Sequence, residues 1–373
     1  MSKTKHTPTV RPRPLRLGFV PLCDCAPIVM ARELGLFEKH GVKVELSREV
    51  GWATIRDKIV YGEIEAAHAP AGMVVAASAG LGSIPVPCLT GLDINTHGNA
   101  ITLSQQLWKK GVRNGADFKR EILKERDRHM FTLGTVFPYS SHTFLLRLWL
   151  RSNGIDPVRD VRIVVVPPPQ MFPNLKGGNL DGYCVGEPWN SAAVMAGTGF
   201  IAATSAELAP FHPEKTLLVK REFSEARHGE HLALIAALVE ACAYCDASEN
   251  GEEIIRTLAL PEYLGAAQPV ISASMGKTFD LGNNRTMPGR DFHIFSRDNT
   301  NEPGLDKAMW VMRSLREDPS ARDSQTLASL RPGDLFRPDL YHEALNTNTN
   351  HHEKPDQHNR LEVDTQEVSL NHR

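Results

Sequence analysis

Apolar and polar residues alternate along the first ninety residues in a pattern that predicts short strands and helices in succession. Apolar runs of strand length occur at 15–20, 42–47, 64–69 and 86–90. Between them lie amphipathic stretches of helix length, at 26–39, 53–62 and 71–80. Because the connections are short, we expect βαβ units with right-handed crossovers and a parallel sheet. A ligand site then belongs at the carboxyl ends of the strands.

A second block repeats this alternation and predicts a second lobe. We expect strands at 130–134, 161–166 and 181–185, and helices at 141–152 and 168–176. Further helices are predicted at 229–246, 251–259 and 304–316, with a loop region rich in Gly, Asn and Asp at 277–304. The last ~30 residues, poor in apolar groups, are typical of a disordered tail.

Composition narrows the class of protein. The chain has 373 residues, enough for two lobes, and 42 Lys plus Arg against 44 Asp plus Glu leave a net charge of -2. The charges of the helical stretch 103–128 do not alternate with aromatic residues in a way that suggests nucleic acid, so the stretch is interpreted as a solvated surface and we expect no direct binding of nucleic acid. No apolar run reaches 18 residues, so we expect no membrane insertion.

The N-terminus and the cysteines predict a cytosolic protein. The basic, Pro-rich start runs into the first strand without the apolar stretch and cleavage site of a secretory signal. Six cysteines, at 23, 25, 88, 184, 242 and 245, are sparse and fit reduced thiols better than a disulfide framework. Neither Cys23-Asp24-Cys25 nor Cys242-x-x-Cys245 has the context of a zinc knuckle, so we expect no metal and no cofactor.

Five strings in this order carry a resemblance to a known family. They are GWATIRDKIVYGEIEAAHAPAGM (51–73), FPYSSHTFLLRLWLRSNGIDPVRDV (137–161), VVVPPPQM (164–171), DGYCVGEPWNS (181–191) and FHPEKTLL (211–218). The chain resembles, over roughly 15–345, the nitrate- and bicarbonate-binding proteins of the NrtA and CmpA type and their cytosolic relative, the NasS-type nitrate/nitrite sensor. The resemblance implies an α/β periplasmic-binding-protein type II fold with a ligand cleft between two lobes. It places lobe 1 at 15–102 plus 216–345, lobe 2 at 103–215 and the tail at 346–373.

The resemblance also implies several ligand-binding residues. Lys215 matches the family position whose ammonium faces nitrate, whereas bicarbonate binders carry an acidic residue thereabouts that holds calcium. Gly186 matches a pocket position where backbone N–H can approach the ligand. Asn99 stands where nitrate binders usually have Gln, and its shorter side chain changes the geometry there. The resemblance therefore favours nitrate or nitrite as the ligand.

Four further residues are judged from their own positions. Trp52 follows a strand and precedes a helix, so its indole N–H could donate to a ligand, although a core aromatic is the alternative. His142 opens the helix 141–152, where an anion is favoured, although a packed or capping histidine is the alternative. Glu187 cannot favourably bind an anion and is expected to orient a donor, and Gln170 is a weaker candidate that is interpreted as structural.

Three functions fit these observations. The first is a cytosolic sensor that closes on nitrate or nitrite and regulates nitrate assimilation through a partner, which in NasS-type relatives is an RNA-binding antiterminator of the ANTAR class. The second is the substrate-binding component of an ABC-type nitrate importer. The third is an enzyme like the thiamine-pyrimidine synthase of the same fold class, but LCDC matches its Cys-rich CCCFC-like string poorly, so we expect no catalytic residues.

Overall fold

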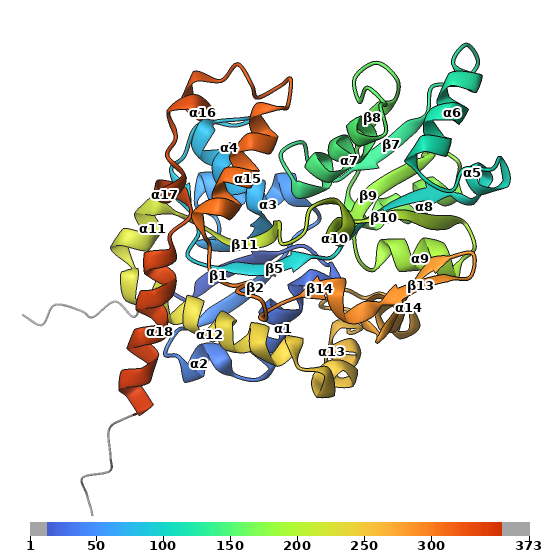
Figure 1. Ribbon diagram of the computed structural model, residues 1–373. Coiled ribbons are helices and arrows are strands. Elements are labelled where there is room, and N and C mark those ends of the chain that lie inside the picture. The colour runs from blue at the N-terminus through green and yellow to red at the C-terminus, as the bar shows by residue number, and fades with distance from the viewer. Residues whose placement is uncertain (1–12, 353–373) are drawn as a thin grey trace, which may run out of the picture.

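The chain forms two α/β lobes, each built on its own sheet (Figure 1). The computed structural model describes residues 13–352. The first sheet has the order β14 (His293–Ile294), β5 (Asp93–His97), β11 (Pro213–Lys220), β3 (Ala66–Pro70), β1 (Leu15–Phe19) and β2 (Val44–Arg48), and β4 (Cys88–Leu89) also pairs with β11. The second sheet has the order β10 (Gly199–Thr204), β6 (Asn99–Ser104), β9 (Gly182–Gly186), β7 (Thr132–Thr135) and β8 (Arg162–Val165).

Both sheets are mixed, which corrects the expectation of parallel sheets. β1 pairs in parallel with β2 and β3, and β7 pairs in parallel with β8 and β9, as βαβ units require. β11 and β5 in the first sheet and β6 and β10 in the second run antiparallel to their neighbours. These four strands lie next to the points where the chain passes between the lobes. They are therefore not joined to their sheet neighbours by the crossover helices that make strands parallel.

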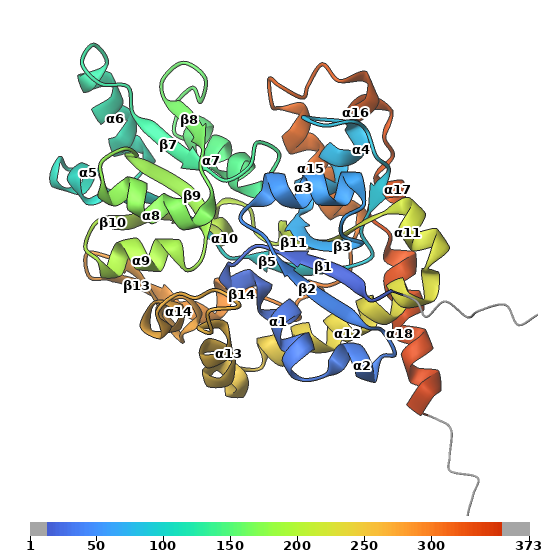
Figure 2. The same ribbon diagram turned by 180° about the vertical axis from the view of Figure 1, so that it is seen from behind.

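Helices cover both faces of the first sheet (Figure 2). α1 (Ala26–Glu33), α2 (Leu36–Lys39), α12 (His228–Asp246) and α13 (Gly251–Leu258) share one core with the sheet. The other core holds α3 (Trp52–Tyr61), α4 (Ala71–Ala79), α15 (Leu305–Arg316), α16 (Gln325–Ser329) and α17 (Pro332–Leu335). The single helix predicted at 26–39 is broken at Gly35, whose φ of 65° is easily adopted only without a Cβ. α11 (Arg221–Ala226) and α18 (Pro338–His352) pack against α12.

The second sheet is covered by α5 (Gln105–Lys109), α6 (Gly115–Glu125), α7 (Ser141–Ser152), α8 (Pro168–Lys176), α9 (Trp189–Met195) and α10 (Ser205–Leu208). α7 and α8 have the predicted bounds. The stretch 103–128, interpreted as a solvated surface, is instead amphipathic, because α6 buries Phe118 and Ile122 in the core of this lobe.

The predicted loop region 277–304 contains a hairpin that reaches across to the second lobe. Its strands are β12 (Thr278–Gly282) and β13 (Arg285–Pro288), preceded by α14 (Gln268–Met275). α14 packs on α9, and β12 packs on β10, before β14 returns the chain to the first sheet. Residues after 216 therefore contact both lobes, although the prediction gave them to lobe 1.

The chain passes between the sheets at two sharp connections. His97 and Gly98, with φ of 63° and 90°, join β5 to β6, and Phe211, with φ of 60°, lies just before β11. The ring of His97 holds the connections together, since its Nε2 accepts from the backbone N of Phe211 at 2.9 Å. The predicted lobe boundaries at 102/103 and 215/216 lie a few residues beyond these points. The predicted tail also starts too early, because α18 continues to His352; the rest of it lies outside the described residues.

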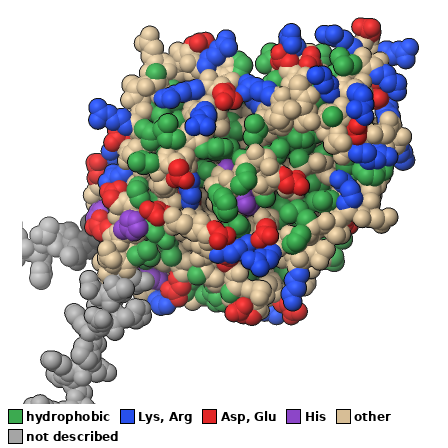
Figure 3. Space-filling model, viewed as in Figure 1, with side chains coloured by type: hydrophobic (Ala, Val, Ile, Leu, Met, Phe, Trp, Pro, Cys, Tyr) green, Lys and Arg blue, Asp and Glu red, His purple; other side chains and the backbone are tan. Residues whose placement is uncertain are grey.

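Charged residues of both signs are mixed over the face seen in Figure 3, in keeping with the small net charge. Within residues 13–352, no single helix has the length and hydropathy to cross a membrane. α12 and the segment Ser248–Leu258 that contains α13 pass such a test only together, and they are bent by 80°.

Candidate functional site

A buried cluster of charged residues lies between the lobes, centred on Lys215 of β11. Its Nζ is 2.6 Å from Oδ2 of Asp24 and 2.5 Å from Oε1 of Glu214. Asp24 lies in η1 (Cys23–Cys25), which follows the end of β1 after a short loop. All three side chains are at most 1% exposed. Buried charges require partners, so this arrangement is a strong constraint on the local structure.

A bulge in β11 explains how two adjacent residues face the same cluster. Side chains of neighbouring residues in a regular strand point to opposite faces of the sheet. The pairing of β11 with β5 shifts register between Pro213 and Lys215 and again between Lys215 and Thr216. Such irregularities re-aim side chains, and here they bring the Glu214 carboxylate against the Lys215 ammonium.

Polar side chains from both lobes surround the two carboxylates. From the first lobe, His68 Nε2 lies 3.1 Å from Asp24 Oδ1. From the second, Asn99 Nδ2 donates to Glu214 Oε2 at 2.5 Å, and His142 Nε2 lies 3.6 Å from Glu214 Oε1. His212, next to β11, places Nε2 3.3 Å from Glu214 Oε2. The cluster therefore joins the lobes.

Burial and these neighbours determine the protonation states. Burial alone would raise the pKa of Asp24 and Glu214, but Lys215 and the histidines outweigh it and lower both. Burial would lower the pKa of Lys215, but Asp24 and Glu214 raise it above its usual value. For His142 burial prevails, although Glu214 opposes it, and the pKa falls to about 4. At neutral pH the cluster holds two carboxylates, one ammonium and the neutral imidazoles of His68 and His142.

Three side chains of the cluster, Trp52, His142 and His68, have ring nitrogens without a hydrogen-bond partner, and of these only His68 has a carboxylate as close as 3.1 Å. Trp52, the first residue of α3, is buried with its ring centroid 5.3 Å from Lys215 Nζ and 5.6 Å from the His68 ring, and its Nε1 is unpaired. Both ring nitrogens of His142, the second residue of α7, are also unpaired. Buried polar groups seldom stay unpaired, so these atoms mark a place where a bound molecule would accept hydrogen bonds.

The other predicted site residues lie at different distances from the cluster. Gly186 ends β9, and a Cβ there would come within 3.5 Å of Asp24 Oδ2 and 3.4 Å of Asn99 Oδ1. Glu187 is buried, but its Oε2 accepts from Ser274 Oγ at 2.7 Å and from Ser191 N at 3.1 Å, and burial raises its pKa. It thus joins α14 to α9 rather than contacting Lys215. Gln170 is exposed on α8.

The sequence-based prediction missed Asp24, His68, His212 and Glu214. All four lie beside or within apolar runs at strand ends, in LCDC, AAHAP and HPEKTLLV. A charged or imidazole group in such a run is a signal for a buried polar site, because burial requires a partner.

The lobes are in close contact on both sides of the cluster. Gly72 of α4 packs on the segment before α7: a Cβ at this position would lie 2.1 Å from the carbonyl oxygen of Tyr139 and 3.1 Å from the Phe144 ring. In this arrangement of the lobes, Asp24, Glu214 and Lys215 are therefore shielded from solvent.

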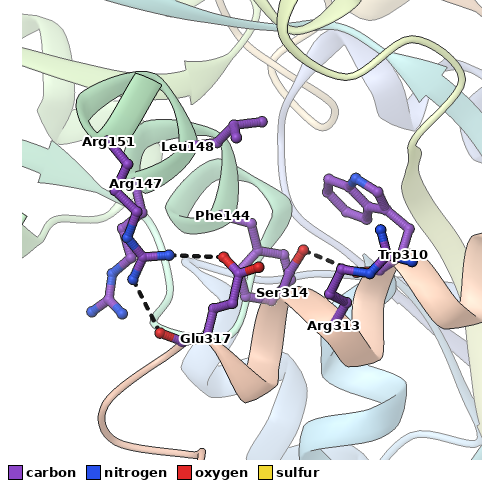
Figure 4. Close-up of a pocket in the computed structure, with 8 residues that line it drawn as sticks. All are labelled: Phe144, Arg147, Leu148, Arg151, Trp310, Arg313, Ser314 and Glu317. Atoms are coloured by element: carbon purple, nitrogen blue, oxygen red, sulfur yellow. Dashed lines mark hydrogen bonds and ion pairs between the residues drawn. The ribbon is translucent and has the colours of Figure 1, made fainter. Parts of the chain in front are cut away.

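A second inter-lobe contact joins α7 to α15 and frames a pocket (Figure 4). Arg151 Nη1 is 2.8 Å from Glu317 Oε2, with both side chains well exposed. One turn away, Arg147 Nη1 is 2.8 Å from Oδ2 of Asp318, a carboxylate that is 1% exposed. Trp310 in the same pocket also packs on His212, with ring centroids 5.3 Å apart, which connects the pocket to the cluster.

We expect these two ion pairs to differ in strength. Arg147→Met leaves the Asp318 carboxylate buried without its cation and should lower the free energy of unfolding by about 2 kcal/mol. Arg151→Met, the matched control, removes an exposed pair and should change it by less than ~0.5 kcal/mol. Urea unfolding of both variants measures the change in the free energy of unfolding. Equal effects would contradict the expectation that the Arg147–Asp318 pair contributes more to stability than the Arg151–Glu317 pair.

The six cysteines are buried free thiols. Burial raises the pKa of Cys25 and Cys242, so both remain protonated near neutrality. Across residues 13–352, no group of three or more His, Cys, Asp or Glu side chains has a geometry suited to a metal ion.

Two α/β lobes joined by paired crossings, with a buried polar cluster between them, define the periplasmic-binding-protein fold. The crystal structure of the periplasmic nitrate-binding protein NrtA from Synechocystis PCC 6803 has a TM-score of 0.83, with 28% identity over 89% of this chain and 88% of that one. The alkanesulfonate-binding protein SsuA from Xanthomonas axonopodis pv. citri shares the fold at a TM-score of 0.65 and 15% identity.

Sequence comparison gives the family. Residues 9–259 match the model of the NMT1-like family, and the nitrate/nitrite binding protein NrtA of Synechococcus elongatus is 31% identical over 88% of this chain and 76% of its own length. The chain belongs to the NMT1-like family and is a relative of the NrtA binding proteins. The predicted fold and resemblance to NrtA are confirmed, while the NasS-type character stays a prediction.

Two longer relatives have higher identity. The nitrate import ATP-binding protein NrtC of Synechocystis is 41% identical and the bicarbonate transport ATP-binding protein CmpC of the same organism is 42% identical, each over 81% of this chain. The aligned region is 45% of either protein, so this chain spans about half the length of these relatives.

Proposed function

We propose that the chain binds one nitrate or nitrite ion between its lobes. The observation that carries this is the convergence, at one buried point, of the Lys215 ammonium with the unpaired indole N–H of Trp52 and the unpaired ring of His142. A planar oxyanion loses its strong hydration when it is buried. The site must therefore supply several hydrogen-bond donors and a cation. The names of the NrtA relatives support the choice of nitrate or nitrite.

Ligand binding would favour the closed arrangement of the lobes, because the donors come from both. Lys215 and Trp52 belong to the first lobe, whereas His142 and Asn99 belong to the second. An anion held by both sides interacts more strongly with the closed state than with an open one, and that difference in affinity shifts the equilibrium. Binding and closure are then one coupled event.

The test is titration calorimetry with nitrate and nitrite on the full chain. We expect one ion per chain, and a stabilisation of ~2.7 kcal/mol when the ion is at ~100 times its dissociation constant. Because CmpC is named for bicarbonate transport, bicarbonate is titrated in parallel, with and without calcium, as the alternative ligand. Stabilisation by bicarbonate and calcium with no response to nitrate or nitrite would contradict the proposal.

We further propose that closure is read by a partner protein, an ANTAR-type antiterminator, and that the chain works in the cytosol as a sensor. Six unpaired thiols suit a reducing compartment. Fractionation of cells and a binding assay with the antiterminator, with and without nitrate, test both points. A periplasmic location and binding to importer subunits would favour the alternative, a component of a nitrate importer.

A further inference from the structure

The charge of the cluster does not suit an anion as it stands. Asp24 and Glu214 carry two negative charges, and Lys215 carries one positive charge that both carboxylates already contact. Among the described residues, Lys215 is the only Lys or Arg within 4.0 Å of either carboxylate. These three groups together carry a net charge of -1, so a nitrate ion entering beside them would meet repulsion between like charges that a buried site screens poorly.

His142 is placed to correct this imbalance. Its ring is buried, both nitrogens lack a hydrogen-bond partner, and Nε2 lies 3.6 Å from Glu214 Oε1. A proton on Nε2 would create a charge-assisted hydrogen bond to this carboxylate with only a small approach of the two atoms. That interaction would compete with Lys215 for Glu214 and leave the ammonium freer to contact an incoming anion.

We propose that nitrate or nitrite binds together with one proton, which is taken from solvent by His142, and that Asp24 is the residue that makes this proton necessary. Asp24 contacts both Lys215 and His68, and these contacts keep its negative charge inside the site. Without Asp24, Lys215 and Glu214 would balance each other and the anion would need no proton. Asp24 is thus the residue that couples anion binding to proton uptake.

The surroundings of His142 agree with this assignment. The charged groups that act on it are Glu214 and Lys215 from β11 and Asp24 from η1, and the imidazole of His212 next to β11 acts on it as well. Around the carboxylates lie also His68 of β3, His293 of β14 and the thiol of Cys184 in β9. Burial keeps the pKa of His142 at about 4 without ligand, and an anion beside the ring would raise it.

This inference rests on the proposed function, and its main test separates the two. The native chain in weakly buffered solution at pH 7 is titrated with sodium nitrate, and protons taken up are measured with a pH electrode while calorimetry in bis-Tris counts bound ions. We expect close to one proton per nitrate. The dissociation constant should then rise by up to tenfold for each unit of pH between 6 and 8.

Two variants identify the groups. In Asp24→Asn, we expect proton uptake to fall toward zero and nitrate to bind more tightly than to the native chain at pH 8, which loss of a merely structural residue would not produce. In His142→Gln, binding should weaken and lose its pH dependence. His129→Gln, an exposed histidine of the second lobe, is the control and should keep the native proton count.

Each outcome decides one point. Nitrate binding without proton uptake at any pH would overturn the inference and leave the proposed function standing. Absence of nitrate binding would overturn the proposed function, and the inference with it. If Asp24→Asn does not fold, the proton count of the native chain still decides.

Discussion

Replacing Lys215 by methionine should lower the free energy of unfolding by about 3–5 kcal/mol and weaken nitrate binding at least tenfold. Methionine has a similar length but no charge, so Asp24 and Glu214 would remain in a buried site without the cation that both contact. Removing one partner of a buried ion pair costs more than the pair itself contributes, because the remaining charge is uncompensated. Urea unfolding and nitrate calorimetry measure the two effects.

Lys220 provides a matched control on the same strand. It is the last residue of β11 and is only partly buried, so Lys220→Met should change stability by less than ~0.5 kcal/mol. Adding Asp24→Asn to Lys215→Met removes one of the two stranded charges and should recover part of the loss. Native stability in Lys215→Met alone would show that the buried cluster makes no net contribution.

Gly72→Ala should block closure of the lobes while leaving each lobe folded. The new Cβ would lie 2.1 Å from the Tyr139 carbonyl oxygen, a backbone atom of the other lobe that cannot rotate away. Such an overlap costs roughly 1–3 kcal/mol or more, so nitrate affinity should fall by about 10- to 100-fold. Small-angle scattering with saturating nitrate should show a larger radius of gyration than for the native chain.

The control is Gly229→Ala in α12, where nothing lies within 4 Å of the added Cβ. This change should leave affinity and shape as they are, with a gain in stability of about 0.5–1 kcal/mol from helix propensity. A native scattering profile and native affinity in Gly72→Ala would show that this contact does not limit closure.

The elements with regular periodicity could be predicted from the sequence, and those beside the crossings could not. α7 and α8 begin with a clear capping residue and a Pro pair respectively, and their bounds follow from local signals. β5, with the sequence DINTH, was not predicted, because it is fully buried yet mostly polar. Its polar side chains have partners in distant parts of the chain, as when Lys307 Nζ lies 3.2 Å from Asp93 Oδ2, and no local sequence pattern indicates this.

The candidate site was predictable where a motif fixed the position and not where tertiary structure did. The resemblance to the family led to Asn99 and Lys215, and positions at predicted helix starts led to Trp52 and His142. The structure brings these four residues together, although their role as ligand contacts stays a prediction. Glu214 escaped because strict alternation would turn it away from Lys215, and only the bulge in β11 reverses this. Asp24 was weighed only as part of a cysteine motif, and its partners lie some 40 and 190 residues away in the sequence.

The position of β11 has a consequence for biosynthesis. This strand lies between β3 and β5 in the first sheet, yet it is made after the whole second lobe. While a ribosome is still producing residues 98–212, the strands already emerged cannot complete their sheet, and the edges of β3 and β5 stay unpaired. Sheets that depend on such distant segments assemble slowly, and exposed edges promote aggregation. The chain would therefore most need a chaperone while the first lobe is still incomplete on the ribosome.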